Sequence, residues 1–97
     1  MLSDSESSLR RQIPVAQRVL GENHESTIKT RWVYAEALYK ADGATLEELR
    51  ESVETLEDTA RIARRVLGGA HPFTPRIDYR LREAQAALRA REASVKH

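Results

Sequence analysis

Two histidines occupy matching places in this chain and are the first residues that could do chemistry. His24 follows Gly21 by three residues and His71 follows Gly68 by three, so the two copies lie 47 residues apart. Histidine serves as a general acid or base near neutral pH and is a common metal ligand. Neither histidine has a cysteine or a cluster of carboxylates beside it. We therefore expect a structural role for both at the start of a helix, with no metal site and no cofactor.

A run of acidic residues could gather a cation or a basic partner. On a helix these side chains surround the side away from the leucines, and Glu57 and Arg61 form a favourable pair one turn apart. A solvated helix face therefore explains the run better than a binding site does. The run consists of Glu47, Glu48, Glu51, Glu54, Glu57 and Asp58.

Basic residues gather in the last third of the chain. Positions 61–91 contain eight arginines and only two acidic residues, Asp78 and Glu83. They spread around two expected helices with few aromatic residues between them, so nucleic acid is not an expected partner. The glycines mark turns rather than a phosphate-binding loop, and nothing positions a Ser-His-Asp triad. A phosphorelay histidine would have to lie exposed in mid-helix, where neither histidine is expected. We predict no catalytic residues and no enzymatic activity.

The composition is that of one small helical domain. The chain has 97 residues, a formal net charge of +1, no cysteine and only four glycines. The near-zero charge provides no field to attract nucleic acid or an anionic membrane, and the lack of cysteine argues against a secreted disulfide scaffold. No apolar run approaches the ~18 residues of a membrane span. We expect a cytoplasmic protein that does not contact membranes.

The chain repeats a helix end, a glycine stop and a helix start. Arg18-Val19-Leu20-Gly21 returns as Arg65-Val66-Leu67-Gly68, and Thr27 returns as Thr74, always 47 residues later. A fixed period of this length is typical of repeat proteins built from one supersecondary unit. The sequence therefore predicts an all-α fold of antiparallel helical hairpins, with three to four helices in about two repeats.

Four helices are expected from the apolar spacing. The clearest spans about 46–67, with Thr45 and Glu48 as a capping box and a continuous apolar stripe. The first is expected over roughly 6–20, starting or bending at Pro14 because proline disrupts a helix interior. The stripe of the third helix is Leu46, Leu49, Val53, Leu56, Ala60, Ala63 and Leu67, and those of the others are Leu9, Ile13, Ala16 and Leu20; Ile28, Trp32, Ala35 and Tyr39; and Ile77, Leu81, Ala84 and Leu88.

The two repeated turns resemble the inter-repeat turns of tetratricopeptide repeats, of the kind that occur in kinesin light chain. The resemblance covers about residues 12–92 and rests mainly on residues 18–24 and 65–74. It implies a single domain over 9–93, which we expect to be flanked by flexible segments at 1–8 and 94–97. Members of this family bind peptides or proteins on a concave face formed by the first helix of each pair. Carried over to this chain, that face has Lys29, Trp32, Val33, Glu36, Tyr39, Lys40, Arg76, Tyr79 and Glu83.

Two functions remain open on the sequence alone. The first is a non-catalytic interaction module that binds a peptide or partner protein on the concave face. The second is a structural element that self-associates through exposed apolar helix faces. Exposed Trp32 and Tyr39 on a concavity would favour the first, whereas their burial together with an apolar outer face on the first or fourth helix would favour the second. The spacing leaves Trp32 open as a core or a groove residue.

Overall fold

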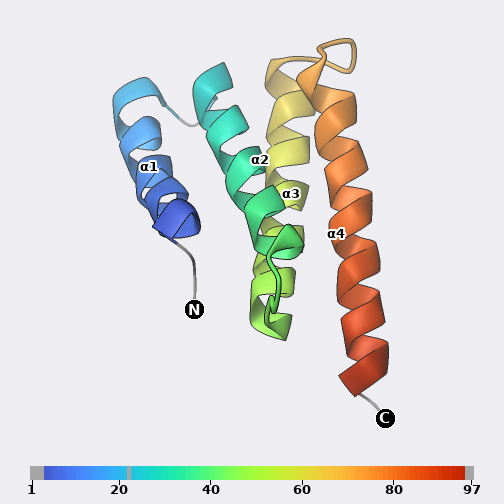
Figure 1. Ribbon diagram of the computed structural model, residues 1–97. Coiled ribbons are helices and arrows are strands. Elements are labelled where there is room, and N and C mark those ends of the chain that lie inside the picture. The colour runs from blue at the N-terminus through green and yellow to red at the C-terminus, as the bar shows by residue number, and fades with distance from the viewer. Residues whose placement is uncertain (1–3, 22, 96–97) are drawn as a thin grey trace.

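The computed structural model describes residues 4–21 and 23–95, with side chains for residues 10–21 and 23–94. The described chain is all-α and contains no strand (Figure 1). Its helices are α1 (Asp4–Leu20), α2 (Glu25–Lys40), α3 (Leu46–Val66) and α4 (Phe73–Val95). Short connections join consecutive helices, which run antiparallel as hairpins. The expected fold class is confirmed.

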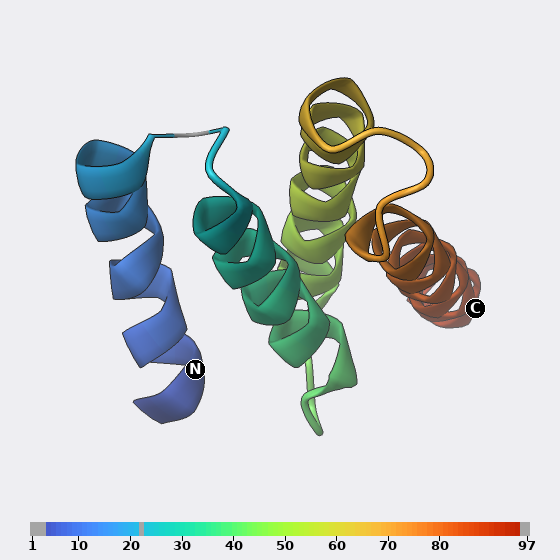
Figure 2. The same cartoon turned by 90° about the horizontal axis from the view of Figure 1, so that it is seen from above.

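The helix α2 is the centre of the molecule. It packs against α1, α3 and α4, whereas α1 has close backbone contacts with α2 alone. Seen from above, the successive helices α2, α3 and α4 follow a zigzag path (Figure 2). The whole forms a slab with extents of 43 × 29 × 15 Å. Neighbours on three sides explain why α2 carries apolar residues on more than one face.

The helix α3 has the boundaries and the buried stripe that its sequence predicts. The backbone N–H of Glu48 donates to Thr45 Oγ1 at 3.1 Å, and the backbone N–H of Thr45 donates to Glu48 Oε1 at 2.8 Å. The bond from the Thr45 backbone lowers the pKa of Glu48 because it favours the ionised carboxylate. The interior of the stripe is buried, and its two end residues, Leu46 and Leu67, are partly buried.

The two repeated turns share a glycine conformation and two hydrogen bonds. Gly21 and Gly68 both have positive φ angles, of 91° and 84°. The backbone N–H of His24 donates to the Gly21 carbonyl at 3.3 Å, and that of His71 donates to the Gly68 carbonyl at 3.2 Å. Each histidine then uses Nδ1 to accept a backbone N–H at the start of the next helix, at 3.0 Å from Ser26 and 3.1 Å from Phe73. The repeat is therefore structural, and the histidines serve as helix caps.

The expected start of the first helix at Pro14 is wrong, because α1 is one continuous helix that begins at Asp4 and contains Pro14. The alternative expectation, a bend at Pro14, stays a prediction. Proline removes one helical hydrogen bond, and the exposed position of Pro14 lets water satisfy the carbonyl that loses its partner. The backbone is helical from position 4, within the segment expected to be flexible, and α4 reaches Val95. The expectations for residues 1–3, 96 and 97 and for the side chain of Leu9 lie outside the described residues.

The core lies where α2, α3 and α4 meet. The fully buried residues Leu56, Ile77 and Ala84 pack with Ile28 and with the large side chain of Trp32. Trp32 is only 8% exposed and meets Phe73 edge to face, with ring centroids 5.4 Å apart. Such an edge-to-face pair adds stabilisation beyond the area that it buries. Trp32 is thus a core residue that fastens α2 to the start of α4.

Candidate functional site

A hollow lies between α2 and α4 on the face predicted to bind partners. Its volume is about 320 Å³, and it is lined by Trp32, Pro75, Arg76, Tyr79 and Arg80. The side chain of Tyr79 is 52% exposed, and Arg76 is exposed beside it. Trp32 contributes only the small part of its indole that the core leaves uncovered. The structure therefore brings three of the expected site residues, Trp32, Arg76 and Tyr79, to one hollow.

Four of the expected residues instead form a network that joins α2 to α4. The Nε of Arg80 lies 2.8 Å from Glu36 Oε1, and Nη1 of Arg80 lies 2.8 Å from Glu83 Oε1. The hydroxyl of Tyr39 donates to Glu83 Oε1 at 2.5 Å. Lys40 Nζ lies 3.9 Å from Glu36 at the edge of this network. These carboxylates are therefore already occupied by partners within the chain.

The pKa shifts follow from the same network. The hydrogen bonds that Glu83 accepts, first from Tyr39 and then from Arg80, lower the pKa of its carboxyl. Burial, followed by the hydrogen bond to Glu83, raises the pKa of Tyr39 well above its ordinary value. Glu83 is thus held as a carboxylate and Tyr39 as a neutral phenol near neutral pH. Groups fixed in this way support helix packing rather than proton transfer.

Arg80 is the functional residue that the sequence analysis left out of its site. Its guanidinium joins Glu36 of α2 to Glu83 of α4 and lies over the ring of Tyr79, 5.4 Å from the centroid. One signal could have found it. Arg80 lies 47 residues after Val33, which was placed on the concave face, so the repeat puts both at the same position.

The repeat also relates the expected site residues to each other. Lys29, Trp32 and Glu36 of α2 return 47 residues later as Arg76, Tyr79 and Glu83 of α4, so that a basic, an aromatic and an acidic residue recur in order. The aromatic position differs in burial between the copies, because Phe73 covers Trp32 while Tyr79 is open. The accessible basic and aromatic groups are therefore Lys29, Arg76 and Tyr79. They can supply charge-assisted hydrogen bonds and an aromatic contact to a bound chain.

A second network lies between α1 and α3 and was not anticipated. The Nε of Arg10 donates to the Tyr34 hydroxyl at 3.0 Å, and that hydroxyl donates to Glu51 Oε2 at 2.5 Å. Nη2 of Arg10 reaches both oxygens of Glu51, at 3.0 and 3.1 Å. Burial, with help from Glu51, raises the pKa of Tyr34 to about 12. The three residues come from three different helices and tie α1 to the rest of the slab.

Within residues 4–21 and 23–95, no helix is long and apolar enough to cross a membrane. The same residues hold no group of three or more histidine, cysteine, aspartate or glutamate side chains arranged to hold a metal ion. Comparison of the chain with known protein families, with characterised proteins and with solved structures finds no match. The resemblance to tetratricopeptide repeats therefore remains a prediction, and the geometry of the α2–α4 hollow is what supports a function.

Proposed function

We propose that this chain is a non-catalytic protein-interaction module of the tetratricopeptide type, acting in the cytoplasm. The observation that carries the proposal is the exposure of Tyr79 and Arg76 at the hollow between α2 and α4. Tyrosine, tryptophan and arginine are the residues that dominate binding energy at protein interfaces. The partner is a protein or peptide that crosses both helices and takes an aromatic and a basic contact from α4.

The network around Arg80, which lines the hollow, supports this role. Arg80 is held by two carboxylates and lies over the Tyr79 ring, so both side chains are fixed before a partner arrives. A surface that is already ordered loses less conformational entropy on binding. The Glu36, Tyr39 and Glu83 side chains contribute to the site by positioning Arg80 rather than by touching the partner.

Affinity capture from an extract of the native cells tests the proposal. The full chain is compared with the double variant Arg76→Ala, Tyr79→Ala and with a control variant of the same helix, Arg82→Ala, Arg89→Ala. All four residues are exposed, so neither variant should lose its fold. We expect the wild type and the control variant to retain the same proteins, and the Arg76→Ala, Tyr79→Ala variant to lose them. Equal retention by all three chains would exclude the hollow as the site.

The alternative function, self-association, is favoured by the burial of the aromatic residues on α2 and by the exposed valines of α1. Trp32 is buried, Tyr39 is half-buried, and α1 exposes the valines Val15 and Val19 on its outer face. Buried aromatic residues together with an apolar outer face on α1 are the features that the sequence analysis expects of a self-associating element. Sedimentation velocity across a range of concentrations tests it, since a self-associating chain gains mass with concentration. The charges on α1 favour a different occupant for this face, as argued next.

A further inference from the structure

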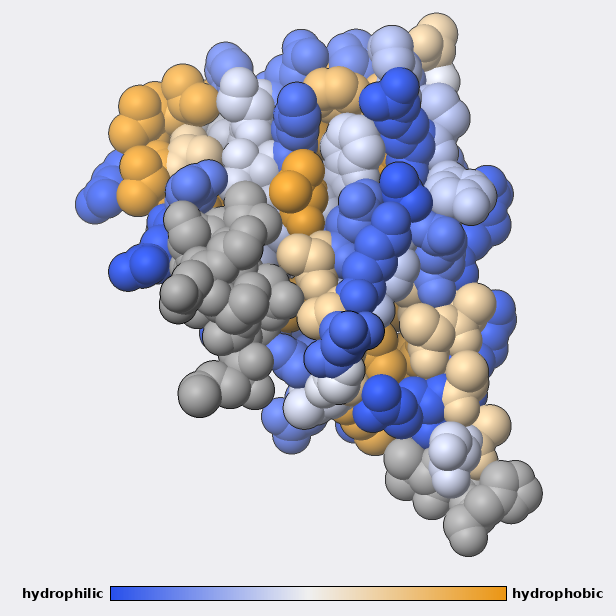
Figure 3. Space-filling model, viewed as in Figure 1, coloured by the Kyte–Doolittle hydropathy of each residue, from blue (hydrophilic) through white to orange (hydrophobic). Residues whose placement is uncertain are grey.

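Among the described residues, the outer face of α1 exposes apolar side chains that no neighbouring helix covers. Val15, Val19 and Leu20 are 50%, 72% and 45% exposed. In the space-filling view, hydrophobic side chains gather at the upper left, over the end of α1 (Figure 3). Contiguous exposed apolar patches commonly mark interaction sites. The repeat indicates what kind of structural element would cover the patch on α1.

Within the described residues, α1 is the copy of α3 against which no second helix packs in the way that α2 packs against α3. We call residues 47 positions apart equivalent. Positions 52, 56, 59 and 63 lie on the α3 face that meets α2, where Ser52 Oγ donates to the Ala35 carbonyl of α2 at 2.7 Å. All four of these residues are fully buried. The equivalent positions in α1 carry Ser5, Leu9, Gln12 and Ala16, three of which are identical to their counterparts. At three of these four positions, α1 therefore has the same residue that α3 has on the face that packs against α2.

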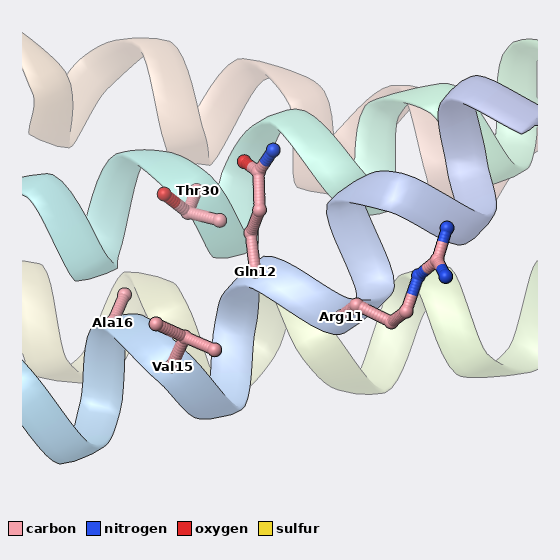
Figure 4. A pocket seen from close by; sticks show the side chains of 5 residues that line it. All are labelled: Arg11, Gln12, Val15, Ala16 and Thr30. Carbon is pink, nitrogen blue, oxygen red and sulfur yellow. The ribbon is translucent and has the colours of Figure 1, made fainter.

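A hollow marks the place where the covering helix is absent. It has a volume of about 420 Å³ and is lined by Arg11, Gln12, Val15, Ala16 and Thr30 (Figure 4). Three of the equivalent residues, Thr59, Ala63 and Ile77, are fully buried. Ala63 and Ile77 belong to the same core cluster as Ile28 and Trp32, which α2 contributes. The hollow on α1 is thus open, whereas the equivalent place on α3 is filled by side chains of α2.

We infer that this face of α1 binds an amphipathic helix of a partner protein, with an apolar stripe like that of α2 and acidic residues at its edge. The charge follows from Arg11, which is exposed and lines the hollow. The equivalent of Arg11 is Asp58, and Asp58 shares a hollow with Arg31 of α2. Because the sign is reversed on α1, the covering helix has an acidic residue where α2 has Arg31.

A second copy of this chain does not offer such a helix. The carbonyl of Ala35 accepts a hydrogen bond from Ser52 of α3, and Leu38 is fully buried one turn further along α2. Their equivalents in α4 are Arg82 and Gln85. The free face of α4 would therefore place a basic and a polar residue on an apolar, basic surface. Two copies of α1 against each other would likewise bring the arginines of one helix near those of the other. Like charges across an interface oppose association.

A peptide copied from α2 provides the probe. It spans Glu25–Lys40, carries Arg31→Glu, and is kept helical by a hydrocarbon staple between positions 29 and 33, both exposed in α2. Fluorescence anisotropy follows its titration with the full chain. We expect saturable binding that Val15→Glu, Val19→Glu in the full chain weakens by about tenfold or more. Val66→Glu is the matched control, since Val66 is the partly exposed equivalent of Val19, and it should leave binding unchanged.

A charge exchange tests the acidic edge separately. Arg11→Glu in the full chain should weaken binding of the Arg31→Glu peptide by about threefold to tenfold and strengthen binding of the unmodified α2 peptide. No binding of either peptide, or binding unaffected by Val15→Glu, Val19→Glu, would overturn the proposal. So would a wild-type dimer in sedimentation velocity that Val19→Glu dissociates, because the occupant would then be a second copy. These results do not depend on Tyr79, so the proposal stands or falls independently of the α2–α4 hollow.

Discussion

At the scale of single residues, Leu56 is one of the largest fully buried side chains and is expected to contribute strongly to stability. It lies in the middle of α3, is fully buried and belongs to the core shared by α2 and α4. Truncation of a buried leucine removes its apolar contacts and leaves a cavity. We predict that Leu56→Ala lowers the free energy of unfolding by about 2 to 5 kcal/mol. Urea denaturation measures this, with exposed Glu57→Ala as the neighbouring control; a loss below ~0.5 kcal/mol would show that the stripe is not core.

Tyr34 predicts a response to alkaline pH. Its pKa is about 12 in the folded chain against an ordinary value of 10.0. A raised folded-state pKa means that the neutral phenol contributes stability that is fully present below pH 10 and is lost as the pH rises toward 12. The destabilisation caused by Tyr34→Phe should therefore shrink between pH 9 and pH 12. Urea unfolding of both proteins across that range measures it, and a difference that stays constant or grows would contradict the assignment.

At the scale of elements, the two glycine turns define the repeat. Gly68 has a φ of 84°, in the region that side chains other than glycine rarely adopt, and an added Cβ would meet no atom within 4 Å. The cost of a substitution there is thus conformational. We predict that Gly68→Ala destabilises the chain by about 1 to 2 kcal/mol. Gly69 is the internal control, since it has open space but no positive φ, and Gly69→Ala should change stability by less than ~0.5 kcal/mol. Equal effects of the two substitutions would contradict the turn geometry.

The elements also show what the sequence could and could not predict. Helix α3 and both turns were predictable because local signals agree there: a capping box, an unbroken stripe and a glycine stop. The continuity of α1 through Pro14 could not be predicted, since it depends on whether water can reach the carbonyl that loses its hydrogen bond to the proline. The networks around Arg80 and Arg10 were not predictable either, because pairs between helices depend on packing angles that no local spacing encodes.

At the scale of the whole molecule, the slab is thinly supported at its N-terminal side. Within the described residues, the backbone of α1 packs on α2 alone, and the side-chain network of Arg10 joins it to α3. Helix α3, in contrast, lies between two helices. Regions with few buried contacts open at lower free energy than the core. We predict that backbone amides of α1 exchange with solvent about tenfold or more faster than those of α3. Hydrogen exchange measured by NMR tests this, and equal protection of both helices would contradict it.

The short array also implies modest stability for the isolated chain. About three repeats are usually needed for independent stability, and the described residues form about two. A bound partner would add stability by mass action, because it binds the folded state alone. This is one reason to regard the exposed surfaces on α4 and α1 as places for other proteins rather than as ordinary solvated surface.

The most direct test of the central claim places a photoreactive benzoylphenylalanine at position 79 of the full chain and irradiates it in an extract of the native cells. The same amino acid at position 89, exposed on the same helix, serves as the control. We expect a defined protein to be cross-linked from position 79, absent from position 89, and lost when Arg76→Glu is added. Identical cross-linking from both positions, or none from position 79, would contradict a partner-binding role for the α2–α4 hollow.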